Sequence, residues 1–172
     1  MAAESDTERT ATAPRFDGHR ISEFIYGTVT GLVAVAGIDG GQGMPWWSAA
    51  SIIIVGAVAI WFAHAYSTLF ARRIAEGHRL NARVAGRALW GSWPIVVAGA
   101  ILALPLIPAA LGFWSLKTAL WASSLVGLLV LALVGFLAGV VTQETWPHRI
   151  LLALLSLGVG FVVVAVELAI HH

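Results

Sequence analysis

The sequence predicts an all-α polytopic membrane protein, a bundle of five transmembrane helices with the N-terminus inside and the C-terminus outside. Hydrophobic residues make up 59% of the 172 residues and charged residues only 11%, less than half of the charged share usual in a soluble domain. Five apolar stretches each approach the ~20 residues that a helix needs to cross a bilayer. If all five cross, every arginine falls on one side and Lys117 on the other, which places the N-terminus in the cytoplasm.

Residues 1–20 precede the first apolar stretch and are polar, with mixed charge. They contain no apolar segment of the kind found in a cleaved signal peptide, so we expect a disordered cytoplasmic tail. The remaining residues, 21–170, predict a single transmembrane domain. Its expected helices span about 21–38, 48–70, 93–111, 119–141 and 149–170.

The longest link between the stretches, 71–91, is rich in arginine and predicts a cytoplasmic loop. Its charged and apolar residues recur at helical spacing, so we expect the second helix to continue or a short amphipathic helix to lie on the membrane surface. Arginines placed there determine topology and bind anionic lipid headgroups; docking of a cytoplasmic partner is the alternative. The residues assigned to this contact are Arg72, Arg73, Arg79, Arg83 and Arg87.

Glycines and prolines inside the stretches predict where helices pack and bend. GxxxG pairs occur at 27–31 and 135–139, and such pairs let helix backbones approach closely. Pro105 and Pro108 each remove a backbone donor from the third stretch. They predict a kink or break in its outer half.

Ionisable side chains are scarce in the apolar stretches, and each is a candidate functional residue because such groups are costly in lipid. Glu23 and His64 both lie near the cytoplasmic ends of their stretches, so an antiparallel pair of helices would bring them to one depth. Glu167 lies near the outer end of the last stretch, where it either reaches the headgroups or lines an outer gate. The predicted polar path comprises Glu23, Tyr26, Thr30, His64, Ser67 and Glu167.

The cluster around Glu23 and His64 has two interpretations. A carboxylate beside an imidazole can relay protons or cations, and histidine is the side chain that ordinarily titrates near neutral pH. The alternative is a hydrogen bond that only joins the two helices, worth about 0.6 kcal/mol on average in membranes. The sequence leaves both open.

Several classes of function are excluded or not expected. The chain has no cysteine, which excludes thiolate catalysis and cysteine-ligated metals. It contains no phosphate-binding loop, nucleophile elbow or HExxH sequence, so we expect no enzyme activity, no cofactor and no metal site. Its net charge of +1 gives no attraction to nucleic acid.

Three segments carry a family resemblance. Residues 24–37 read FIYGTVTGLVAVAG, residues 63–67 read AHAYS before a charged stretch, and residues 104–108 read LPLIP. These resemble the first, second and proline-containing third helices of the vacuolar iron transporter family, which implies a five-helix fold with a cytoplasmic N-terminus and cation transport. Thr30 stands where that family has an aspartate, and the arginine-rich link replaces its glutamate-rich metal-binding helices.

The leading hypothesis is a small cation or proton-linked transporter or channel that resembles this family. We expect it to be a homo-oligomer, because five short helices leave little interior for a pore. The alternative is a non-catalytic structural or accessory subunit of a larger membrane complex, which the scarcity of buried charge favours. The preference for arginine over lysine, with abundant alanine and glycine, indicates a GC-rich genome and hence the inner membrane of a bacterium.

Overall fold

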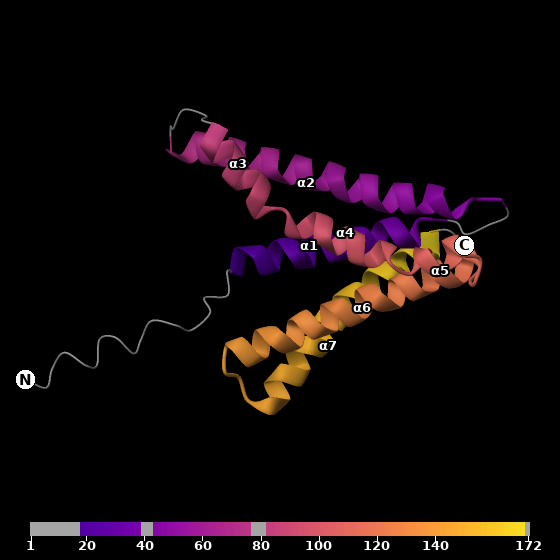
Figure 1. The fold of residues 1–172 in the computed structure, drawn as a ribbon. Coiled ribbons are helices and arrows are strands. Elements are labelled where there is room, and N and C mark those ends of the chain that lie inside the picture. Colours follow the sequence, from indigo (N-terminus) through magenta and orange to yellow (C-terminus); the bar gives the residue numbers. More distant parts are fainter. Residues whose placement is uncertain (1–17, 39–42, 77–81, 171–172) are drawn as a thin grey trace, which may run out of the picture.

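A computed structural model describes residues 18–38, 43–76 and 82–170 of the chain. Within these ranges the chain is all-helical, as expected (Figure 1). The seven helices of the described residues are α1 (Gly18–Ala36), α2 (Trp46–Glu76), α3 (Ala82–Gly91), α4 (Pro94–Ala103), α5 (Leu106–Ala110), α6 (Leu116–Val141) and α7 (Trp146–Ile170).

Four segments of the described chain are long and apolar enough to span a membrane. They are Trp46–Ala71, Ala82–Ala103, Leu116–Val141 and Trp146–Val166. The chain is therefore compatible with a multi-pass membrane protein. Helix α1 is not among the four, since its first turns carry His19, Arg20 and Glu23. It also begins at Gly18, inside the segment for which the sequence predicts a disordered tail.

The third predicted span differs most from the structure. The apolar segment starts at Ala82 instead of near residue 93, so much of the predicted 71–91 loop is helical, with α2 reaching Glu76 and α3 following. Alanines make up much of α3 and favour this helix. The chain bends between α3 and α4, and α4 ends before Pro105, which has no N–H and clashes with the preceding turn.

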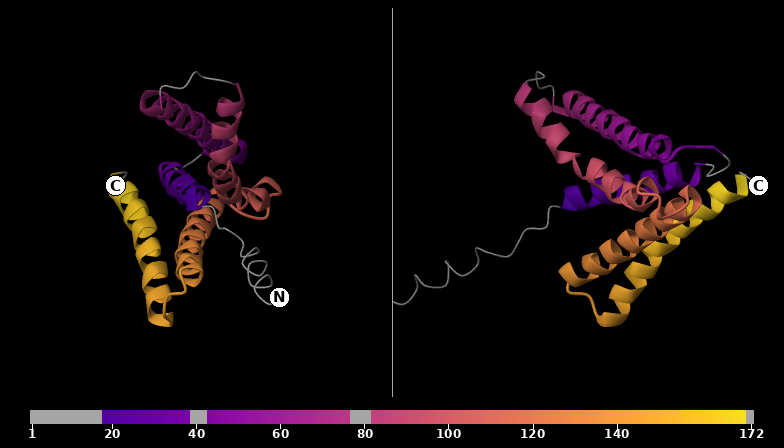
Figure 2. Two further views of the ribbon diagram at one scale, coloured as in Figure 1. Left: turned by 90° about the vertical axis from the view of Figure 1, so that its left-hand side faces the viewer. Right: turned by 45° about the vertical axis from the view of Figure 1, so that its right-hand side comes forward.

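Helix α1 lies in the middle of the bundle and contacts α2, α4, α6 and α7. Helices α2 and α3 form one arm beside it and α6 with α7 the other, and Figure 2 shows the arms splaying apart where α1 begins. Small residues allow the close approach: a Cβ on Gly27 would lie 2.7 Å from the Cα of Ile95 in α4. The GxxxG pair at 27–31 therefore packs helices closely, as predicted.

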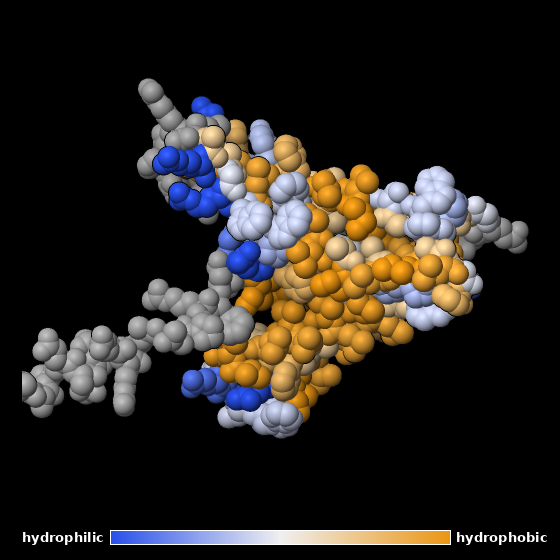
Figure 3. Space-filling view, viewed as in Figure 1, coloured by the Kyte–Doolittle hydropathy of each residue, from blue (hydrophilic) through white to orange (hydrophobic). Residues whose placement is uncertain are grey.

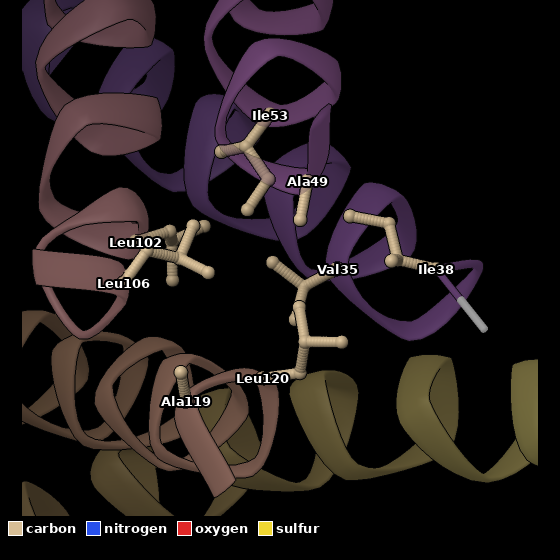
Figure 4. Close-up of a cluster of buried hydrophobic side chains, with 8 residues drawn as sticks. All are labelled: Val35, Ile38, Ala49, Ile53, Leu102, Leu106, Ala119 and Leu120. Atoms are coloured by element: carbon tan, nitrogen blue, oxygen red, sulfur yellow. The ribbon is translucent and has the colours of Figure 1, made fainter. Parts of the chain in front are cut away.

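Aliphatic side chains fill the other half of the bundle, where the helices converge. A cluster from α1, α2, α4, α5 and α6, with one residue just beyond α1, closes this half (Figure 4). Its buried members are Val35, Ile38, Ala49, Ile53, Leu102, Leu106, Ala119 and Leu120. We call this group the aliphatic cluster.

The surface has an apolar band between two more polar ends (Figure 3). One end, which we call the arginine end, gathers the start of α1, the end of α2, the start of α3 and the α6–α7 turn (Figure 1). It holds Arg20, Arg73, Arg83, Arg87 and Arg149 of the described residues. Lys117, at the start of α6, lies at the opposite end.

The packing of α1 on α4 can be tested with Gly27→Ala. The added methyl group meets backbone atoms of Ile95 at 2.7 and 3.0 Å, which cannot move aside as a side-chain tip can, so we expect a loss of about 1–3 kcal/mol in unfolding free energy. Unfolding in mixed micelles, followed by circular dichroism, measures it.

Gly56→Ala is the matched control, because a Cβ at Gly56 would have nothing within 4 Å. Alanine should be neutral there or stabilise α2 by up to about 1 kcal/mol. Equal effects of the two substitutions would contradict the close α1–α4 contact.

Candidate functional site

Glu23 is a buried carboxylate on the first turns of α1, near the arginine end. Its side chain is only 2% exposed. It lies on the inward face of α1, whose buried residues recur at helical spacing and include Gly27 and Gly31. Because glycines follow it on this face, α4 comes close to α1 from Gly27 onward.

His64 of α2 is bonded to this carboxylate. Its Nε2 lies 2.8 Å from Glu23 Oε1, within hydrogen-bond distance. Tyr26 lies three residues after Glu23 on α1. The centroid of its ring lies 5.4 Å from the centroid of the His64 ring. The antiparallel α1–α2 pair therefore brings together Glu23, Tyr26 and His64 of the predicted path.

A second imidazole reaches the same carboxylate oxygen. His19, one turn before Glu23 on α1, places its Nε2 3.5 Å from Glu23 Oε1. The sequence analysis missed His19 because it assigned residues 1–20 to a disordered tail. The four-residue spacing between His19 and Glu23 is the signal that could have found it, since residues i and i+4 are neighbours on a helix.

The other carboxylate oxygen of Glu23, Oε2, is buried and has no hydrogen-bond partner among the described residues. Buried polar atoms in proteins nearly always have a partner. The contact between Oε1 and His64 can hold a proton on either residue, either as an ion pair or as a neutral pair. The arrangement is thus suited to taking up and releasing a proton at a buried position.

The hydroxyl groups of the predicted path do not join this cluster. Thr30 donates to the carbonyl oxygen of Tyr26 on its own helix, at 2.9 Å, and Ser67 donates to that of His64, also at 2.9 Å. Such bonds satisfy the hydroxyl within one helix. Glu167 lies near the end of α7, but its side chain is outside the described residues.

Trp61 ties α2 to the junction of α3 and α4 beside the cluster. Its Nε1 donates to the carbonyl oxygen of Leu89 at 2.9 Å, and its ring meets that of Trp93 edge to face with centroids 6.1 Å apart. The same junction lies close to His19, because a Cβ on Gly91 would lie 3.9 Å from His19 Nε2. Nothing in the residue pattern predicts this contact between distant residues.

Access to the cluster differs between the two ends of the bundle. Exposure of the side chains falls from 47% at His19 and 31% at His64 to 2% at Glu23. Further along α1, Val35 and Ile38 belong to the aliphatic cluster, which contains no polar group (Figure 4). The partly exposed groups of the site therefore lie toward the arginine end, and the aliphatic cluster lies toward the other end.

The described residues contain no group of three or more His, Asp or Glu side chains arranged to hold a metal ion. Of the arginines assigned to lipid or partner contact, Arg73, Arg83 and Arg87 are exposed. Arg79 and the side chain of Arg72 lie outside the described residues.

Comparison with family models, curated proteins and solved structures finds no match to this chain. The resemblance to the vacuolar iron transporter family therefore stays a prediction.

A double-mutant cycle tests the Glu23–His64 contact. His64→Ala leaves a buried carboxylate without its hydrogen-bonded partner, so it should destabilise the protein more in the wild type than in the Glu23→Gln background. We expect a coupling of about 0.5–3 kcal/mol, measured by unfolding in mixed micelles.

Ser67→Ala is the control, because its hydroxyl bonds only to its own helix. It should change the unfolding free energy by less than about 0.5 kcal/mol and show no coupling to Glu23→Gln. A coupling of zero for His64→Ala would mean that the contact does not hold the two helices together.

Proposed function

We propose that this multi-pass membrane protein moves protons across the bilayer, alone or coupled to another solute, and that Glu23 and His64 hold the moving proton. One observation carries the proposal: a carboxylate that is 2% exposed has one oxygen on an imidazole and the other without a partner. Ionisable groups at membrane depth are expensive and usually functional. Carboxylate and histidine chains are the usual proton relays of pumps and transporters.

The proposal treats α1 as a fifth span beside the four apolar segments. Its contacts with α2, α4, α6 and α7 support this placement, because protein buries Glu23 while His19 and Arg20 stay exposed at the arginine end. With five spans, the arginine end faces the cytoplasm and the C-terminus faces outside. On the exposed side of α3, Arg83, Arg87 and Trp90 are then placed to meet anionic headgroups.

Protons fit the site better than metal cations do. A metal ion needs several ligands in a fixed geometry, whereas a proton needs only groups that can gain and lose it. The arginines of the arginine end repel a doubly charged metal ion more strongly than a single proton, and a proton can pass between neighbouring groups as a hydrogen bond is exchanged. The closed aliphatic cluster favours a transporter that changes conformation over an open channel.

Proton flux into liposomes tests the proposal. Purified protein is reconstituted with a trapped pH-sensitive dye, and a potassium diffusion potential drives proton entry. Glu23→Gln and His64→Ala should lower the protein-dependent rate by about 100-fold, the size of effect that a positioned proton-transfer group contributes. Fe²⁺ and Mn²⁺ entry is measured in the same vesicles.

Ser67→Ala and Thr30→Val are matched controls on the same two helices, because both hydroxyls bond within their own helix. They should keep the wild-type rate. A wild-type rate equal to that of empty liposomes would reject proton transport and favour the accessory-subunit alternative.

The topology is tested with single cysteines, since the chain has none. A membrane-impermeant maleimide added to intact cells should label Lys117→Cys and leave Arg87→Cys unlabelled until the membrane is opened. Labelling of both residues from outside would contradict an odd number of spans between them.

A further inference from the structure

We propose that His19 is the residue through which protons enter and leave the Glu23–His64 pair from the arginine end. This inference rests on the proposed function and names a proton-transfer residue that it does not include. His19 Nε2 lies 3.5 Å from the same oxygen, Oε1, that His64 Nε2 contacts at 2.8 Å. The two imidazoles therefore lie near a single carboxylate oxygen, the more exposed one on α1 and the less exposed one on α2.

The exposure of the three side chains gives the order of transfer. His19 is 47% exposed and Glu23 is 2% exposed, so water can reach the first and protein covers the second. A proton arriving at the arginine end therefore meets His19 before it meets the carboxylate. His64 is 31% exposed and lies on the other helix, where it fixes the carboxylate while His19 is free to turn.

A purely stabilising role explains the position of His19 poorly. Helix N-termini favour acidic side chains, because their free N–H groups carry partial positive charge, and a histidine one residue inside α1 is the opposite choice. The contact of 3.5 Å is also longer than a hydrogen bond. Glu23 already has His64 as a bonded partner, so His19 is not needed to anchor the carboxylate.

The proposed step is a simple proton exchange. Protonated His19 turns toward Glu23, its Nε2–H bond breaks, and an O–H bond forms at Oε1. His19 becomes neutral and takes its next proton from water at the arginine end. The proton on Oε1 then passes to His64 Nε2 once that nitrogen has lost the proton it held, which restores both the carboxylate and the Nε2–H···Oε1 hydrogen bond. No electron acceptor or other co-reactant is required.

Chemical rescue tests this role in the proton-flux assay. His19→Ala should lower the flux by about 10-fold or more in weakly buffered solution, and millimolar imidazole should restore it, because a small base can replace an exposed side chain. His64→Ala should be rescued less than His19→Ala, since His64 is the less exposed of the two and is bonded directly to Glu23. Glu23→Gln vesicles with the same imidazole give the background leak.

Two further variants separate proton transfer from structure. His19→Gln keeps a polar group beside Glu23 but cannot take up and release a proton as imidazole does. It should therefore lose flux while its unfolding temperature stays near that of the wild type. Ser22→Ala, on the same turn, removes a hydroxyl that bonds only to a backbone carbonyl and should leave the flux unchanged.

The outcomes separate this inference from the proposed function. If the wild type carries protons and His19→Ala or His19→Gln carries them equally well, His19 is not the entry residue and only this inference falls. A loss in His19→Ala that imidazole does not restore also rejects it. If the wild type carries no protons, the proposed function falls first and the inference falls with it.

Discussion

A carboxylate can lie at the depth of Glu23 only where protein surrounds it, because lipid offers it neither water nor a hydrogen-bond donor. Much of the arrangement follows from this constraint. Helix α1, which carries Glu23, occupies the centre of the bundle, and the apolar segments of the chain pack around it. Glycines on its inward face let α4 come close to α1. His64 then supplies the donor that the membrane cannot.

The α1–α2 pair changes character along its length. At the arginine end the pair joins ionisable groups, and the two arms of the bundle splay apart (Figure 2). At the other end it joins Val35, Ile38, Ala49 and Ile53, which pack with residues of α4, α5 and α6. The ionisable groups and the aliphatic cluster thus lie at opposite ends of the α1–α2 pair.

The sequence predicted the features that repeat or that differ sharply from their surroundings. Apolar runs pointed to the four segments that are long and apolar enough to span a membrane, and the isolation of Glu23 and His64 in such runs pointed to their contact. Helix boundaries were harder to predict. The arginines of α3 favour a loop, whereas α3 and the apolar α4 together form a segment apolar enough to span a membrane. His19 was lost for the same reason: composition assigned it to a tail, although its spacing from Glu23 places it on the same helix.

Contacts between distant residues could not be predicted from one sequence. The Trp61 indole meets a carbonyl oxygen 28 residues away, and only the bend between α3 and α4 brings Leu89 to it. The hydroxyls of Thr30 and Ser67 show that residues on one helical face need not contact each other. They share helical faces with Glu23 and His64, yet each bonds within its own helix, because a threonine or serine in a helix has a nearby carbonyl always available.

The central place of α1 has a consequence for how the protein is made. Ribosomes synthesise α1 before the helices that enclose it, and α6 and α7 come last. Until those later helices arrive, the side of α1 that bears Glu23 lacks most of its cover, and its low hydropathy gives it little tendency to remain in lipid alone. Helix α1 is thus made before α2, α4, α6 and α7, and its surroundings are complete only after α7 has been synthesised.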